Sequence, residues 1–440
     1  MGIDILQQLQ SGKLAGSKQL KLCCGLTEFP AEIFDLADTL EILDLSGNQL
    51  SSLPDDFTRL KKLKILFLSD NNFTVFPEVL SQCENLDMIG FKANKLHTIS
   101  ETALPVQTRW LILTNNQLTT LPASIGKCFR MQKLALAGNR LKTLPAELSN
   151  CKNLGLLRIS ANELQELPMW LLTMPKLSWL AFSGNPFCIT APISTNLQTI
   201  PWQQLTIQHQ LGEGASGIIS KAVWQQPTHP AKEVAVKVFK GKVTSDGLPE
   251  DEMNACILAG RHENLVEVLG RIAFHPSQKE GLVLSLIPTS YYNLGLPPSF
   301  DSCTRDVFAE GTTFSVQQII QIVSSIAAVA AHLHARGIMH GDLYAHNTLI
   351  DENAHAIFGD FGAASLYDTR NTSIANALER IEVSAWGCLL EDLLNNVVDT
   401  EASGITIEAL INLKQMAMLP DVANRPNFAY IHNQLKQMVY

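Results

Sequence analysis

The sequence has few charged side chains, and they are not biased toward positive charge. Charged residues are 17% of the 440, and the formal net charge is −9. A basic surface that holds nucleic acid or an anionic membrane is not expected from this balance. We therefore predict no nucleic-acid partner.

Long uninterrupted apolar runs are also missing. The start, MGIDILQQLQSGKLAG, lacks the charged end and apolar core of a secretory signal, and Leu6 stands where a myristoylation pattern needs Ser or Thr. The most apolar stretch, 319–335, is interrupted by polar residues such as Gln321 and Ser324. It predicts a buried helix rather than a membrane span. We expect a cytoplasmic protein with no membrane segment.

Cysteines are few and do not form a framework. There are nine, an odd number, and the Cys23-Cys24 pair has no second pair at zinc-site spacing. Reduced thiols are expected, without a structural metal.

The first two hundred residues repeat. An Asn recurs every 22 or 23 residues and closes patterns such as LEILDLSGNQL. These Asn residues are 48, 71, 94, 116, 139, 162 and 185. The pattern resembles the leucine-rich repeat, in seven copies. The Leu-x-Leu core predicts one short strand per copy with its apolar side inward, and the Asn can bond backbone groups where the chain leaves the strand.

Other repeat positions also have structural expectations. Proline follows the Asn by six residues in five of the first six copies and should begin the convex segment; these are Pro54, Pro77, Pro122, Pro145 and Pro168. Cys83, Cys128 and Cys151 share a position taken by apolar residues in other copies, so they are predicted to be core residues. Leu20-x-Leu22 looks like a degenerate first copy, and residues 3–9 like a capping helix.

One position of each strand should face the concave side of the stacked repeats. Its occupants are Ile42, Ile65, Met88, Trp110, Lys133, Leu156 and Trp179. An exposed apolar stripe of this kind marks a recognition surface, so we expect it to bind a protein partner or the chain's own second domain. The alternative is that these side chains pack on one another along the strands. A polar, proline-punctuated stretch then places the domain boundary near residue 200.

The second part opens with a glycine-rich turn. Gly212, Gly214 and Gly217 form GxGxxG after Leu211, with Ile219 two residues on. A dinucleotide site uses the same glycines but should open a helix. Here the chain continues as a strand, which favours a hairpin laid over phosphates.

A central lysine and a helix acid follow. Lys237 lies within VAVKVFK; alone it could be a solvated strand residue, but its order in the chain favours phosphate binding. Its carboxylate partner is predicted to be Glu252 rather than Asp251. GLVLSLIP then predicts a buried strand leading to Ser285, Leu286 and Ile287, whose backbone could bond an adenine edge, with Leu284 behind it. A long loop, 289–315, precedes the apolar helix.

The stretch MHGDLYAHN and the later Gly-Asp-Phe-Gly complete the motif order. Residues 205–440 thereby resemble the eukaryotic-type protein kinase family. The resemblance implies that Asp342 orients or deprotonates the acceptor hydroxyl, and that Asn347 and Asp360 hold magnesium on ATP. It also implies that Ala235, Ile219 and Leu349 sandwich the adenine ring.

The motifs depart from the family pattern in four places. Gly341 replaces the Arg that receives an activating phosphate, so that switch is not expected. Tyr344 replaces a Lys that contacts the transferring phosphate in Ser/Thr kinases. No Ala-Pro-Glu follows, and only residues 363–381 separate the Asp-Phe-Gly turn from a helix beginning near Glu382. Glu379 is a candidate partner for Arg425.

The sequence therefore predicts an α/β leucine-rich-repeat solenoid (1–200) followed by an α+β two-lobed protein kinase-like domain (201–440). The predicted function is ATP- and Mg²⁺-dependent phosphorylation of a protein, with Ser or Thr as the preferred acceptor. Two alternatives stay open. One is a pseudokinase-type scaffold or nucleotide-sensing interaction module, which the short activation segment favours. The other is a small-molecule kinase. The oligomeric state is not predicted.

Overall fold

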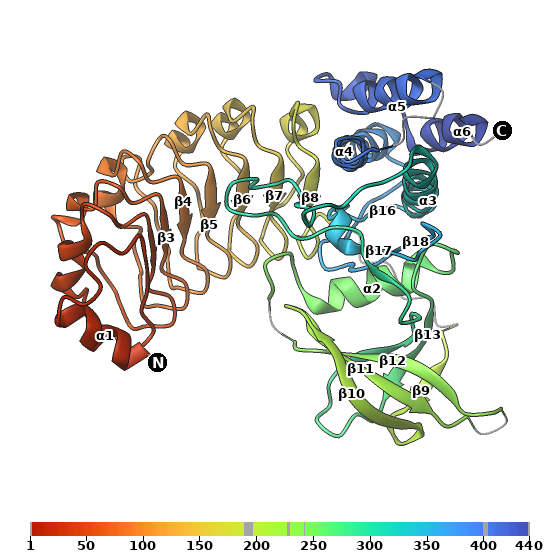
Figure 1. Ribbon diagram of the computed structural model, residues 1–440, viewed down its shortest axis with the longest axis horizontal. Helices are drawn as coiled ribbons and strands as arrows, with labels where there is room; N and C mark the ends of the chain where they lie inside the picture. The colour runs from red at the N-terminus through yellow and green to blue at the C-terminus, as the bar shows by residue number, and fades with distance from the viewer. Residues whose placement is uncertain (1, 189–196, 227–228, 242, 399–403, 439–440) are drawn as a thin grey trace. The chain divides into compact units, whose positions relative to one another are not determined.

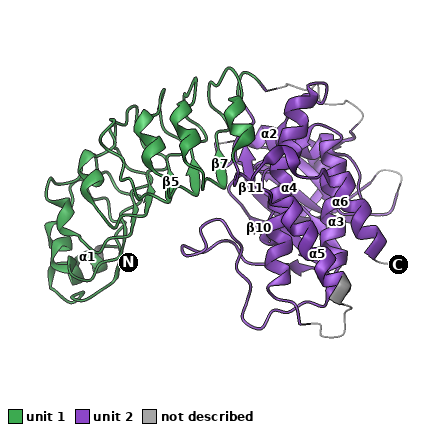
Figure 2. Ribbon diagram, turned by 90° about the horizontal axis from the view of Figure 1, so that it is seen from above, with its two compact units in different colours: residues 1–174, 185–187 green, residues 175–184, 188–440 purple. Residues whose placement is uncertain are grey.

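The computed structural model describes residues 2–188, 197–226, 229–241, 243–398 and 404–438. They form two compact units, residues 1–174 with 185–187, and residues 175–184 with 188–440 (Figure 2). The predicted boundary at residue 200 differs from this division, because residues 175–184, which carry the seventh repeat strand, group with the second unit. Part of the predicted linker, 189–196, lies outside the described residues.

The first unit contains one short strand per repeat, and these strands lie side by side in chain order (Figure 1). Neighbouring strands are parallel and in register, so that Ile42 pairs with Ile65 and Ile65 with Met88. The strands follow helix α1 (Gly2–Gln10) and are β1 (Gln19–Lys21), β2 (Ile42–Asp44), β3 (Ile65–Phe67), β4 (Met88–Gly90), β5 (Trp110–Ile112), β6 (Lys133–Ala135) and β7 (Leu156–Arg158). The degenerate first copy is confirmed, because it forms β1.

Short 3₁₀ helices return the chain from one strand to the next. They are η1 (Ala31–Leu36), η2 (Phe57–Arg59), η3 (Glu78–Gln82), η4 (Ala123–Lys127), η5 (Ala146–Asn150) and η6 (Met169–Thr173). Pro77, Pro122, Pro145 and Pro168 stand immediately before four of them, as predicted. Proline suits this place because its φ is fixed and the first N–H of a helix has no internal acceptor.

The repeat Asn residues form a buried ladder of hydrogen bonds, which confirms their predicted role. Asn139 is typical: its Nδ2 donates to the carbonyls of Leu113 (2.9 Å) and Leu136 (2.8 Å), and its Oδ1 accepts from the amide of Leu118 (3.1 Å). One side chain thus pairs three backbone groups that would otherwise be buried without partners.

The three repeat cysteines are core residues, as predicted. Cys83, Cys128 and Cys151 are at most 7% exposed. Burial raises the pKa of the Cys83 thiol to about 11, that of Cys128 to about 12 and that of Cys151 to about 11. They remain protonated and unreactive at neutral pH.

The predicted exposed apolar stripe is wrong for four of its members. Ile65, Met88, Leu156 and Trp179 are 2–6% exposed. In-register neighbours of the first three lie one strand spacing away, so long apolar side chains cover one another. Ile42 and Trp110 are half-buried, and the Lys133 ammonium lies over the Trp110 ring at 4.2 Å.

The second unit has a six-stranded sheet, ordered β10-β11-β12-β14-β13-β9, and several short strands (Figure 1). Its apolar face includes Val234, Val236 and Val283, and Met253 of helix α2 packs on Phe239. The strands are β8 (Trp179–Ala181), β9 (Thr199–Pro201), β10 (Leu205–Glu213), β11 (Gly217–Trp224), β12 (Lys232–Phe239), β13 (Val268–Ala273), β14 (Gly281–Ser285), β15 (Tyr292–Asn293), β16 (Ile338–Met339), β17 (Thr348–Ile350), β18 (Ala356–Phe358) and β19 (Ser365–Leu366).

A helical part completes the second unit. The helices are α2 (Pro249–Ala259), α3 (Val316–His334), α4 (Thr372–Leu394), α5 (Gly404–Ala417) and α6 (Phe428–Met438), with η7 (Trp202–Gln204), η8 (Ala345–Asn347) and η9 (Val422–Asn424). A capping box between Ser315 and Gln318 begins α3. Within the described ranges α3 alone is long and apolar enough to span a membrane, and 56% of that window is buried inside the protein. The solenoid and the two-lobed domain match the predicted fold class.

Candidate functional site

The glycine-rich turn joins β10 and β11 as an antiparallel hairpin, as predicted. An added Cβ at Gly212 or Gly214 would meet no atom within 4 Å, so both face open space, and the Gly214 amide donates to the Gly217 carbonyl (3.0 Å). Gly217 differs, because its Cβ would come within 2.7 Å of the Val238 carbonyl oxygen. The tip can therefore approach a phosphate chain while its base is held against β12.

Lys237 lies on β12 and forms a buried ion pair with Glu252 of α2. The pairing confirms Glu252 over Asp251 as the carboxylate partner. Burial lowers the pKa of Lys237, but the Glu252 and Asp360 carboxylates outweigh it, and the net pKa is raised. Burial raises the pKa of Glu252. The ammonium stays charged beside Asp360, where it can meet a phosphate oxygen.

The predicted nucleotide-binding residues lie on β10, β11, β12 and β17, at the end of β14 and just after it. Ala235 pairs with Leu284 across β12 and β14, and Ile219 pairs with Lys237 across β11 and β12. Ala235 is buried, whereas Ile219, Leu284, Ser285, Leu286, Ile287 and Leu349 are half-buried and Leu211 is 47% exposed. The Ser285 amide donates to the Glu267 carbonyl (2.9 Å), so it is not free for an adenine edge.

The catalytic loop joins β16 to β17 and brings Asp342 and Asn347 together. Asn347 Nδ2 donates to the Asp342 carboxylate (2.7 Å) and to its carbonyl (3.0 Å). This fixes the amide so that its Oδ1 is directed away from Asp342. Asp360 follows β18 in the left-handed region (φ 57°), and its exposed carboxylate accepts from the Gly362 amide (3.2 Å).

Two buried side chains support this loop from beneath. Glu382 of α4 accepts from the amides of His340 (3.2 Å) and Gly341 (2.6 Å). Burial alone would raise the pKa of Glu382, but these bonds and that of His334 (2.8 Å) lower it. Burial lowers the pKa of His340, which is thus neutral and bonds the Gly359 carbonyl (3.0 Å). The two aspartate-bearing turns are tied together through His340.

Strand β8 packs on the other side of the catalytic loop. The chain's own second domain is one of the two partners predicted for the stripe that contains Trp179, but the sequence does not predict which of its residues Trp179 contacts. The Trp179 ring stacks on Tyr344 with centroids 4.5 Å apart and an angle of 3°, and Trp179 Nε1 donates to the Leu343 carbonyl (3.0 Å). Gly341 has φ 74°, and an added Cβ would lie 2.7 Å from the carbonyl oxygens of Leu180 and Ala363. Gly341 and Tyr344, which replace the Arg and Lys of the family pattern, are the sequence signal that could have indicated a different neighbour for this loop.

Other contacts attach the same segment to the shortened activation region. Ser365 Oγ accepts from the amides of Phe182 (2.9 Å) and Ser183 (3.2 Å), and Ser178 Oγ bonds Ser384 Oγ of α4 (2.9 Å). Helix α4 starts at Thr372, earlier than predicted, which shortens the region between it and the Asp-Phe-Gly turn further.

The predicted Glu379–Arg425 pair is wrong. Arg425 is 2% exposed and donates to three carbonyls, those of Leu419 (2.8 Å), Arg380 (3.1 Å) and Pro175 (2.6 Å). Glu379 instead accepts from the Phe428 amide (2.9 Å). Burial without a carboxylate among these described partners lowers the pKa of Arg425 to about 10.

The residues present fit a nucleotide-bound divalent metal rather than a protein-only metal site. No cluster of three or more metal-binding side chains occurs among the described residues. Asn347 Oδ1 and the Asp360 carboxylate are hard oxygen donors, and magnesium completes a shell of this kind with phosphates and water. Their chemistry therefore suits a metal that arrives with its nucleotide.

Comparisons with known proteins agree with both units. The leucine rich repeat pattern matches residues 19–73 and 38–96, and the pattern described as protein tyrosine and serine/threonine kinase matches residues 205–434. The tyrosine-protein kinase receptor TYRO3 of Danio rerio is 26% identical over 233 residues, which is 52% of this chain and 26% of that protein. Serine/threonine-protein kinase STY17 of Arabidopsis thaliana is 24% identical over 294 residues, 58% of this chain and 48% of that protein.

A probable serine/threonine-protein kinase of Dictyostelium discoideum is 28% identical over 206 residues, 46% of this chain and 12% of that protein. This chain thus spans less than half the length of these relatives. The kinase pattern, however, covers more than half of the chain, and its motifs coincide with the glycine hairpin, the Lys237–Glu252 pair and the catalytic loop. The chain belongs to the protein tyrosine and serine/threonine kinase family.

Proposed function

We propose that this protein is an ATP- and Mg²⁺-dependent protein kinase that acts in the cytoplasm, prefers Ser or Thr hydroxyls, and uses its leucine-rich repeats to recognise proteins. The bond between Asn347 and Asp342 is the observation that carries the proposal. A module that only bound nucleotide would have no need of an oriented carboxylate at this position.

Each site residue then has a separate role. Lys237, held by Glu252, binds phosphate oxygens, and the glycine hairpin covers the phosphate chain. Asn347 and Asp360 hold magnesium, which when bound neutralises charge on the phosphates. Asp342 orients the acceptor hydroxyl and takes its proton as the hydroxyl oxygen bonds to the γ-phosphorus. The bond between that phosphorus and the bridging oxygen breaks, and ADP leaves with the electron pair.

The short activation region favours a second candidate, an inert scaffold. Only β19 and a brief turn lie between the Asp-Phe-Gly motif and α4, and Tyr344 is buried where a kinase commonly presents a Lys. A scaffold of this kind binds nucleotide through Lys237 but transfers no phosphate.

One experiment separates the two. The purified chain is incubated with magnesium and labelled ATP, with casein as a general acceptor, beside Asp342→Asn and the surface control Asp368→Asn. We expect label on protein from the wild type and control, and a loss of about 100-fold or more in Asp342→Asn. Thermal stabilisation by nucleotide in all three proteins without transfer in any would establish the scaffold instead.

A further inference from the structure

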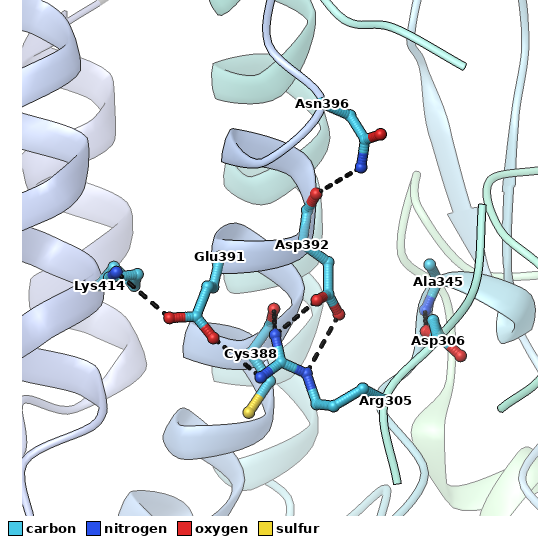
Figure 3. A network of polar contacts seen from close by, with 8 residues as sticks. All are labelled: Arg305, Asp306, Ala345, Cys388, Glu391, Asp392, Asn396 and Lys414. Atoms are coloured by element: carbon cyan, nitrogen blue, oxygen red, sulfur yellow. Dashed lines mark hydrogen bonds and ion pairs between the residues drawn. The ribbon is translucent and has the colours of Figure 1, made fainter. Parts of the chain in front are cut away.

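Two consecutive residues of the long segment between β15 and α3, Arg305 and Asp306, contact two different elements (Figure 3). The side chain of Arg305 reaches α4, whereas Asp306 lies beside Ala345 of the catalytic loop. The segment therefore contacts both the catalytic loop and α4 through adjacent residues.

Arg305 anchors the segment firmly. Its guanidinium donates to Glu391 (2.8 Å), to both carboxylate oxygens of Asp392 (2.5 and 3.3 Å) and to the Cys388 carbonyl (2.9 Å). Lys414 of α5 also lies 3.3 Å from Glu391. A guanidinium bound at four acceptors is held in one orientation, which fixes the residue that follows it.

Asp306 is fixed against the turn that carries Asn347. Its carboxylate accepts from the Ala345 amide (2.5 Å) and contacts His346 Nδ1 (2.6 Å), and its side chain is 3% exposed. The turn η8 begins at Ala345, and its preceding residue, Tyr344, provides no side-chain cap. Asp306 therefore supplies from another segment the acceptor that this turn needs.

We propose that Asp306 is a positioning residue of the kinase reaction. It fixes η8, and through Asn347 it fixes the Asp342 carboxylate, so that the magnesium ligand and the proton acceptor are set by the 295–315 segment. The inference rests on the proposed phosphoryl transfer and assigns part of its geometry to a region outside the motifs.

The contact with His346 agrees with this assignment. Asp306 holds the Ala345 amide and the His346 ring together, so one carboxylate fixes two consecutive residues of η8.

The test uses the full-length protein as wild type, Asp306→Asn and Asp306→Ala, with Glu310→Ala as an exposed control from the same segment. Hydrogen exchange follows the amides of residues 342–349. The magnesium concentration that half-saturates ADP stabilisation is measured by thermal shift, and kcat and KM for ATP by labelled transfer.

We expect Asp306→Ala to speed exchange at residues 345–347 and to raise the half-saturating magnesium concentration about tenfold. We expect kcat to fall about tenfold or more, and KM for ATP to change by less than twofold. Asp306→Asn keeps the shape of the side chain and is the variant to use if the Ala variant does not fold. It should change exchange and the half-saturating magnesium concentration in the same direction by smaller amounts. Glu310→Ala should match wild type.

Unchanged exchange and magnesium dependence in a folded Asp306 variant would overturn the assignment. So would an equal loss in Glu310→Ala. These two readouts need no catalysis, so altered exchange and magnesium dependence in a protein that transfers no phosphate would uphold the positioning contact and reject the proposed kinase activity.

Discussion

At the residue scale, the neighbours of Gly341 leave no room for a side chain. Its φ of 74° and the two carbonyl oxygens 2.7 Å from an added Cβ exclude a side chain. We predict that Gly341→Arg, which restores the family's common residue, destabilises the protein by about 3 kcal/mol or more from left-handed strain and steric overlap. Urea unfolding of the variant and the wild type measures this loss of stability.

Gly311→Arg is the matched control for this change. Gly311 has φ 81°, but an added Cβ there meets nothing within 4 Å, so it contributes strain without overlap. Its cost should be about 1 kcal/mol. Equal costs at the two sites would show that β8 does not press on Gly341.

Burial of the Asp251 carboxylate lowers the stability of the fold at neutral pH. Burial raises its pKa to about 6 from 3.8, so the folded state binds a proton more tightly than the unfolded state does. Its charge therefore destabilises the fold above pH 6, and this cost disappears as the pH falls toward 4.

We predict that Asp251→Asn raises the free energy of unfolding by about 2 kcal/mol at pH 8 and by little at pH 4. Glu352→Gln, at an exposed turn elsewhere in the second unit, is the control and should change neither value. Urea titrations at both pH values measure the free energy of unfolding. An equal increase at pH 4 and pH 8 would contradict the prediction that the Asp251 charge destabilises the fold.

At the element scale, the repeat strand depends on its Asn. Asn139→Ala leaves three buried backbone groups without their partners and should cost about 3 kcal/mol or more. Asn72 lies in the same kind of turn, but its side chain accepts only from Lys95 in the described contacts, at the surface. Asn72→Ala should lower the free energy of unfolding by less than about 1 kcal/mol. Thermal unfolding of both variants measures the two losses. Comparable losses at both positions would contradict the ladder.

Elements with a strong local signal could be predicted from the sequence. The repeat period gave the strands, the proline positions and the buried cysteines, and the motif order gave the hairpin, Lys237–Glu252 and the catalytic loop. Contacts between distant segments have no local signal. The bond from Asp306 to Ala345 and the carbonyl partners of Arg425 therefore went unpredicted. For Trp179 the sequence predicted contact with the second domain as one of two possibilities, but not its stacking on Tyr344. The exposure of the apolar stripe was predicted wrongly.

At the scale of the whole molecule, the position of the domain boundary has a measurable effect. A fragment of residues 175–440 keeps the bonds of Trp179, Ser178 and Pro175 to the rest of the second unit. A fragment of residues 189–440 loses these bonds but keeps β9. We predict a melting temperature at least about 8 °C higher for the longer fragment. A fragment of residues 201–440 also loses Ile200 of β9 from the core, so it should melt below the 189–440 fragment. Equal melting of the 175–440 and 189–440 fragments would contradict the prediction.

The attachment of β8 to the catalytic loop also limits how a chain of this kind can change by inheritance. Whole repeats upstream of residue 154 can be gained or lost by recombination while the segment that stacks on Tyr344 and lies against Gly341 is kept. The seventh repeat is different, because its strand must pass to descendants together with the kinase motifs. An exchange of repeat arrays between related genes should therefore have its crossover before Pro175 and not in the linker near residue 200.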